Sequence, residues 1–239
     1  MTFDVWRSHS NKSEIIITAG VDGDEYAGIE AARQLIKFFS TTVPTIPLTI
    51  IPLVNRAGNN QGLDYNPLDG LFPKHIYPGF PLGTSSSRLM WKLSRIVRGH
   101  KLWLDLHGGN REEHLHPFVW ADRTGTPTDH LTTHLLSNLS ATTLYSQAPS
   151  LAPARYLSKR GTSYLVFESG ELGQQKPFMV NQHLSWVKQA IKAYQAYQPQ
   201  RHYSFSPTYT HLSHIPHQLS GEKPTSLLWY GPTYYYLGN

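Results

Sequence analysis

The stretch that decides the fold runs from residue 14 to residue 40 and reads EIIITAGVDGDEYAGIEAARQLIKFFS. Its first part, Glu14–Ala19, is apolar and rich in β-branched residues, which predicts a buried strand that ends at Gly20. After the turn, apolar residues recur at helical spacing from Ile29 to Phe39. The stretch therefore predicts a strand, a tight turn and a helix.

The same alternation continues along the chain. Further strands are predicted at Thr45–Val54, Lys101–Leu106, Pro117–Ala121 and Ser163–Glu168. Further helices are predicted at Ser85–Val97, Pro127–Leu139 and Val180–Tyr197. Because strands that alternate with helices form sheets covered on both faces, we predict an α/β protein, a three-layer α/β/α sandwich with a mixed, largely parallel sheet.

Composition limits the class of protein further. The chain has 239 residues, of which 39% are hydrophobic, enough for one domain with a real core. We expect a catalytic metallohydrolase domain at residues 1–197 and an aromatic-rich extension at residues 198–239 that packs on it. The chain has no cysteine, so any metal site must use His, Asp and Glu.

The distribution of charged and apolar residues bears on partners and location. The net charge is +5, but the Lys and Arg residues are dispersed, so we expect no nucleic-acid partner. The first residues contain no apolar run, and no stretch approaches the roughly 20 apolar residues of a membrane helix. We therefore expect a cytoplasmic protein with no membrane partner. The aromatic extension could form a subunit interface, which leaves a homo-oligomer open.

The turn after the first predicted strand holds two acidic residues. Asp22 lies in the turn and Glu25 begins the helix, so both carboxylates can point at one cation. The alternative is that these residues only favour the helix N-terminus, with Asp24 as its cap. The pattern by itself leaves both interpretations open.

Further polar residues end the strands at 101–106 and 163–168. By strand alternation Asp105 and His107 point to the same side, so His107 can offer a ligand nitrogen and Asp105 can hold a neighbouring group. Glu168 ends its apolar strand, where an unpaired carboxylate is costly to bury. Glu171, in the Gly-rich loop that follows, is a competing candidate.

Residues 55–84 form a long segment that is rich in Gly, Pro and Asn and has little periodicity. A loop of that length in a compact domain is usually functional. It opens with Asn55 and Arg56, directly after the second predicted strand. Because ligand sites of such sheets lie at the carboxyl ends of the strands, we expect these two residues to bind substrate near Asp22, His107 and Glu168.

Four segments, taken in order, resemble the succinylglutamate desuccinylase/aspartoacylase-like deacylases, a branch of the zinc carboxypeptidase clan. They are GVDGDEYAGIEAARQL (20–35), NPLDGLFPKHIYPG (66–79), WLDLHGGNREEHLHPFVW (103–120) and GTSYLVFESGELG (161–173). The resemblance covers roughly residues 14 to 195. It implies one zinc ion held by Asp22, Glu25 and His107, with Glu168 as the catalytic general base.

The sequence also departs from the family pattern. Asp22 stands where a zinc-binding His is usual, and two carboxylates with one imidazole cancel the charge of a divalent ion. We therefore expect a weaker Lewis acid and a site friendlier to Mn²⁺ or Fe²⁺. The Asn-Arg pair that grips the substrate carboxylate becomes Lys74 and His75, which we expect to bind substrate. The family's upstream arginine falls near positions 63–64 and is lost, and Arg56 is a possible replacement.

These residues predict a metal-dependent hydrolase that cleaves the amide bond of an N-acyl amino acid or a related small amide. The ion activates a water, and Glu168 takes its proton and later protonates the leaving amine. Two alternatives remain open. One is a carboxypeptidase or amidase that acts on a peptide, including cell-wall peptides. The other is a non-catalytic relative that keeps the fold for a binding role.

Overall fold

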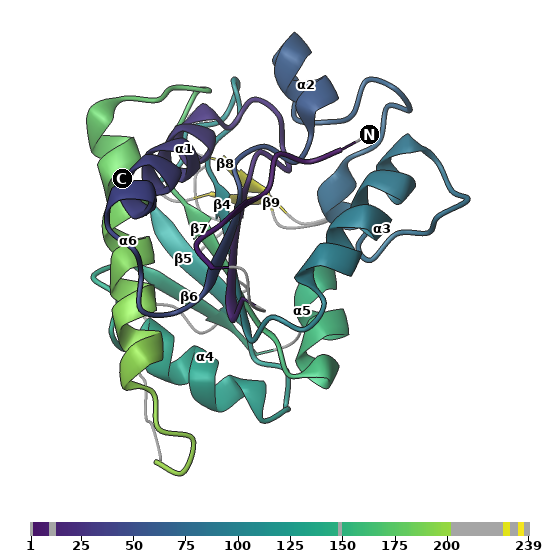
Figure 1. Ribbon diagram of the computed structural model, residues 1–239. Helices are drawn as coiled ribbons and strands as arrows, with labels where there is room; N and C mark the ends of the chain where they lie inside the picture. Colours follow the sequence, from purple (N-terminus) through teal and green to yellow (C-terminus); the bar gives the residue numbers. More distant parts are fainter. Residues whose placement is uncertain (1, 10–12, 148–149, 202–226, 230–233, 237–239) are drawn as a thin grey trace.

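The computed structural model describes residues 2–9, 13–147 and 150–201 with their side chains, and the backbone of residues 227–229 and 234–236. Its centre is a seven-stranded sheet with the strand order β1-β3-β2-β4-β7-β5-β6 (Figure 1). β1 pairs antiparallel with β3, β5 pairs antiparallel with β7, and the other neighbours are parallel. The strands are β1 (Trp6–Arg7), β2 (Ile15–Ala19), β3 (Leu48–Ile51), β4 (Leu102–His107), β5 (Phe118–Asp122), β6 (Thr143–Ser146) and β7 (Ser163–Glu168).

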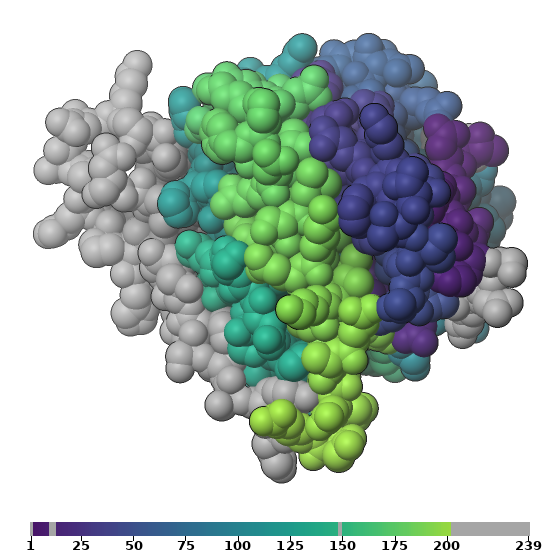
Figure 2. Space-filling view, turned by 60° about the vertical axis from the view of Figure 1, so that its left-hand side comes forward, coloured from purple at the N-terminus to yellow at the C-terminus, as the bar shows by residue number. Residues whose placement is uncertain are grey.

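Helices cover both faces of this sheet. The α-helices are α1 (Tyr26–Thr41), α2 (Arg56–Gln61), α3 (Ser85–Val97), α4 (Thr128–Leu136), α5 (Ala152–Leu157) and α6 (Pro177–Ala196), and the 3₁₀ turns are η1 (Pro73–His75) and η2 (Ser158–Arg160). α1, α4 and α6 pack on one face, where α1 and α6 lie side by side (Figure 2), and α3 and α5 pack on the other. The predicted α/β/α sandwich with a mixed, largely parallel sheet is confirmed.

The two faces of β4 show why its sequence is almost continuously apolar. Leu102, Leu104 and Leu106 belong to the core beneath α1 and α6, whereas Trp103 packs in the core beneath α3 and α5. A central parallel strand is buried on both sides, so the side chains that point to either face of the sheet must be apolar. Asp105 is the exception in this strand, and it is buried as well.

Several elements differ from the prediction. The strand predicted at Thr45–Val54 is only β3, because Pro47 and Pro52 lie just outside it and cannot donate hydrogen bonds to a sheet. The two-residue strand β1, the edge strand β6 and the short helices α2 and α5 were not predicted. Each is too short to show a periodic pattern.

The predicted extension at residues 198–239 lies mostly outside the described residues. Within it, β8 (Leu227–Trp229) and β9 (Tyr234–Tyr236) pair antiparallel. Its packing on residues 1–197 stays a prediction. None of the helices in the described part of the chain is both long and apolar enough to cross a membrane.

Candidate metal centre

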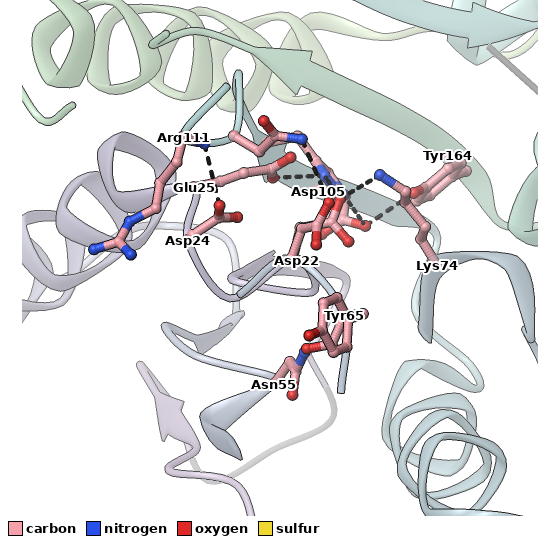
Figure 3. Close-up of polar contacts among 12 residues, drawn as sticks. Asp22, Asp24, Glu25, Asn55, Tyr65, Lys74, Asp105, Arg111 and Tyr164 are labelled. Atoms are coloured by element: carbon pink, nitrogen blue, oxygen red, sulfur yellow. Dashed lines mark hydrogen bonds and ion pairs between the residues drawn. The ribbon is translucent and has the colours of Figure 1, made fainter. Parts of the chain in front are cut away.

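The polar residues predicted from strand ends lie at one edge of the sheet. The turn after β2 carries Asp22 and Glu25, and the neighbouring strands β4 and β7 end with His107 and Glu168. β4 and β7 are paired in register, so that His107 lies opposite Glu168. Figure 3 shows the side chains from the β2 turn and from β4 gathered in this region.

Asp22, Glu25 and His107 form a compact buried cluster. Each offers one ligand atom, and these atoms lie within 4.8 Å of one another. The His107 Nδ1 atom is 2.9 Å from Glu25 Oε2 and 3.5 Å from Asp22 Oδ2. The three residues have exposed fractions of 0%, 6% and 5%, so the cluster is shielded from solvent.

One carboxylate oxygen of the cluster, Asp22 Oδ1, accepts no hydrogen bond from the described residues. A buried carboxylate oxygen without a donor is costly, and a divalent cation is the partner that relieves that cost. Asp24 is not the N-cap of α1, because Glu25 occupies that position, without a side-chain capping bond. Asp24 accepts instead from the Arg111 backbone N–H, at 3.2 Å. The donor set therefore fits an ion such as Zn²⁺.

Lys74, from the 3₁₀ turn η1, is paired with this cluster. Its Nζ atom donates to Asp22 Oδ2 at 2.6 Å (Figure 3). Burial alone would raise the pKa of Asp22, but the charge of Lys74 and a hydrogen bond with His107 hold that pKa well below its ordinary value. Burial would lower the pKa of Lys74, but Asp22 and Glu25 raise it above its ordinary value. Both members of the pair are therefore charged.

Asp105 holds the far side of the His107 ring. Its Oδ2 atom is 3.2 Å from His107 Nε2 and accepts a hydrogen bond from the Tyr164 hydroxyl at 2.9 Å. The Thr18 hydroxyl donates to the other oxygen, and Trp103 Nε1 donates in turn to Thr18 at 2.6 Å. Nε2 thus faces Asp105, which leaves Nδ1 directed at the two carboxylates of the cluster. The contact confirms that Asp105 and His107 share one side of β4.

Glu168 and its competitor Glu171 have different surroundings. Burial raises the pKa of Glu168, and the nearby positive charges of His107 and Lys74 oppose that rise. Glu171 instead accepts from His114 Nδ1 at 2.8 Å, and both side chains are partly exposed. The geometry therefore favours Glu168 over Glu171 as the carboxylate of the site.

Glu113 is a further acidic residue that sequence reasoning missed. Burial and the negative charge of Glu168 raise the pKa of Glu113 to about 7. Its loop is fixed against the end of β7, because Gly109 N–H donates to Gly170 O and Leu172 N–H donates to Glu113 O, each at 2.8 Å. Nothing periodic in the sequence around Glu113 indicates that position.

Two of the other residues predicted to bind substrate make contacts away from the cluster. Asn55 caps α2, since its Oδ1 atom accepts from Gly58 N–H at 3.0 Å and its Nδ2 atom donates to Tyr65 O at 3.1 Å (Figure 3). Arg56 pairs with Asp4 at 2.6 Å between two exposed side chains. His75 lies on η1 and is exposed. Their role toward a substrate stays a prediction, and Lys74 is the member of the set that meets the cluster.

The sequence of the chain matches a known catalytic domain. The family model of the succinylglutamate desuccinylase/aspartoacylase catalytic domain matches residues 11–197. The chain belongs to this family. The cluster, Asp105 and Glu168 all lie inside the matched residues.

Individual members of the succinylglutamate desuccinylase/aspartoacylase family show the likeness in more detail. The N-alpha-acetyl-L-2,4-diaminobutyric acid deacetylase of Halomonas elongata is 30% identical over 105 residues, which are 44% of this chain and 31% of that enzyme. A succinylglutamate desuccinylase structure from Silicibacter sp. has a TM-score of 0.72 at 17% identity, covering 87% of this chain and 64% of its own. A succinylglutamate desuccinylase/aspartoacylase structure from Rhodobacter sphaeroides has a TM-score of 0.67 at 22% identity, covering 76% and 56%. The chain thus spans less than two thirds of each relative, and the structural likeness establishes the fold alone.

Proposed function

We propose that this protein is a metal-dependent amidohydrolase that removes the acyl group of an N-acyl amino acid or a related small amide. The observation that carries the proposal is the buried cluster of Asp22, Glu25 and His107, whose ligand atoms lie within 4.8 Å of one another and whose Asp22 Oδ1 atom has no hydrogen-bond partner among the described residues. The deacetylase of Halomonas elongata supports the reaction class, because its name gives an N-acetyl amino acid as the substrate. The family membership supports the same class.

The chain's own residues would divide the work as follows. Asp22, Glu25 and His107 would hold one Zn²⁺, with Mn²⁺ or Fe²⁺ as alternatives. When bound, such an ion supplies Lewis-acid polarisation of a carbonyl and lowers the pKa of water. Asp105 fixes the orientation of the His107 ring through the contact with Nε2.

Glu168 is the proposed proton carrier of the reaction. It would accept a proton from the attacking water and deliver it to the leaving amine. Burial raises its pKa, which brings its proton affinity closer to what this shuttle requires. Lys74 would help to stabilise the negative charge that develops on the carbonyl oxygen, since its ammonium lies beside Asp22.

The test combines metal analysis with an activity panel. We expect the purified protein to contain one equivalent of a divalent metal and to hydrolyse at least one N-acetyl or N-succinyl amino acid. Glu168→Gln should lose activity by about 10²-fold or more while it retains metal, and Glu171→Gln should remain active. Release of an amino acid from peptides alone would indicate the peptidase alternative. Absence of both metal and hydrolysis would indicate a non-catalytic relative.

A further inference from the structure

A cavity lies on the face of the sheet opposite to α1 and α6. It has a volume of about 530 Å³ and is lined by residues 78–81, by three residues of α3 and the two residues after that helix, and by Tyr156, Leu157, Arg160 and Thr162. Two of the lining residues lie just before neighbouring strands. Gly99 is three residues before the start of β4, and Thr162 is the residue before β7. The metal centre lies where these strands end, so the two sites are at opposite ends of the sheet. α3 and α5, which both contribute lining residues, lie on the same face of the sheet (Figure 1).

Three arginines line this cavity. Arg95 lies in the last turn of α3, Arg98 is the C-cap residue of that helix, and Arg160 ends η2. In the described part of the chain, none of the three pairs with a carboxylate. A helix C-terminus favours positive charge, which accounts for the two arginines of α3. Arg160 also lies in the last turn of its helix, but it comes from another segment and lines the same cavity.

The Arg160 side chain is held in place before any ligand binds. Its guanidinium lies 3.7 Å from the centroid of the Tyr156 ring, and its Nη1 atom donates to Tyr156 O at 2.8 Å. A planar guanidinium presents several donors in one fork, a geometry that matches phosphate and carboxylate groups. Because the fork is already ordered, less conformational entropy is lost when an anion binds.

Aromatic side chains form much of the remaining wall. Trp91, Phe80 and Tyr156 all line the cavity, and Phe80 is 59% exposed. Aromatic faces beside arginines stack flat rings such as a nucleic-acid base. The volume also falls within the roughly 300–1,000 Å³ typical of small-molecule pockets.

We propose that this cavity binds a small anion that joins a phosphate to a flat ring, that is, a nucleotide. Its phosphates would contact Arg95, Arg98 and Arg160, and its base would stack on the aromatic wall. The ligand class follows from the combination, because the guanidiniums favour a phosphate and the exposed ring of Phe80 favours a flat ring beside it. The site is independent of the proposed hydrolase activity.

ADP is the probe for the test. Ribose 5-phosphate, which lacks the base, and adenosine, which lacks the phosphates, are the partial ligands. By calorimetry we expect ADP to bind the full-length protein and each partial ligand to bind at least about tenfold more weakly. Arg160→Gln and the double variant R95Q/R98Q should each weaken ADP at least about tenfold, the loss of a charge-assisted contact. All three arginines are exposed, so the variants should fold, which circular dichroism would verify.

Arg155→Gln is the matched control, because Arg155 is an exposed arginine of α5 that does not line the cavity. It removes the same charge and should leave ADP affinity unchanged. Failure of ADP to bind would overturn the proposal. So would equal losses in Arg155→Gln, which indicate a general effect of charge, or full affinity in Arg160→Gln and R95Q/R98Q, which places ADP elsewhere. Equal binding of ribose 5-phosphate and ADP would refute the stacked ring.

Discussion

Replacing Lys74 by methionine tests the electrostatic account of the metal centre. The substitution keeps the length of the side chain and removes the ammonium that lies 2.6 Å from Asp22. Asp22 is fully buried and Lys74 is 32% exposed in its side chain, so the carboxylate would be left without its main counter-charge. Removing one partner of a buried ion pair costs about 3–5 kcal/mol, and the partial exposure of Lys74 places the expected loss near the lower end.

The same substitution should have the opposite effect on metal binding. A divalent ion with two carboxylate ligands is formally neutral, and the Lys74 ammonium adds one positive charge beside it. The expectation of a weaker Lewis acid, which was drawn from Asp22 alone, did not include this positive charge. Without it, Asp22 is a better ligand for a cation, so Zn²⁺ should stabilise Lys74→Met more than it stabilises the wild type.

Urea unfolding with a chelator and then with Zn²⁺ measures both effects. Lys37→Met is the control, since Lys37 is an exposed lysine of α1 far from the cluster in the sequence. If Lys74→Met loses no more stability than Lys37→Met in the chelator, the buried pair is absent. If Zn²⁺ stabilises Lys74→Met less than the wild type, the charge account is wrong.

The ion pair of Asp22 and Lys74 also determines how Asp22→His should affect zinc affinity. This variant alone would place an imidazole beside an ammonium with no carboxylate between them, so it should lose zinc affinity. The double variant D22H/K74N removes that repulsion and should bind zinc more tightly than Asp22→His alone. A double-mutant cycle on zinc affinity should give a coupling of about 0.5–3 kcal/mol, and additive effects would show that the two positions are independent.

Three further changes test other parts of the structure. Asp105→Asn should lower metal affinity by about 10- to 100-fold in a chelator competition, because the His107 ring loses its anchor, and an unchanged affinity would contradict that role. Burial lowers the pKa of His183 to about 4, below its ordinary value of 6.5. The unfolded chain therefore binds a proton at this residue first as pH falls, and His183 by itself should contribute a loss of about 3 kcal/mol of stability between pH 6.5 and pH 4. Urea unfolding across that window should show a shallower pH dependence in His183→Gln, and an identical dependence would refute the assignment. Gly28→Ala places a Cβ atom 2.8 Å from a β4 carbonyl oxygen, so it should cost about 1–3 kcal/mol in urea unfolding, and a change within experimental error would contradict the close packing of α1 on the sheet.

The sequence predicts those parts of the fold that repeat a pattern over many residues. The bounds predicted for Ser85–Val97 and Ser163–Glu168 agree with α3 and β7 because one has a regular apolar stripe and the other an unbroken apolar run. The convergence of Asp22 and His107 followed from the rule that parallel strands end at one edge. These predictions rest on local apolar patterns and on the alternation of strands with helices, and both can be inferred from the sequence.

The contacts of the segment 55–84 could not be predicted in the same way. Lys74 reaches Asp22 because tertiary contacts hold the loop, among them the bonds from the Ser86 backbone N–H and hydroxyl to Asp69 at 2.6 Å and 2.8 Å. No period in the sequence reports such contacts. Asn55 is different, because an Asn followed seven residues later by Gly62 has the pattern of the N-cap and C-cap of a short helix, here α2. This capping pattern is present in the sequence, although α2 itself is too short to show periodicity.

The strand order has a consequence for how the protein folds. Thr18 and Asp105, which meet beside the metal centre, are 87 residues apart in the chain. The turn after β2 therefore receives its His107 only when a loop of that length has closed, and closing long loops is among the slow steps of folding. A nascent chain that has completed only its first strand and helix carries two acidic residues and no histidine partner. The full three-ligand site is thus complete only after this loop has closed, and uptake of the proposed ion would report that the centre of the sheet has been assembled.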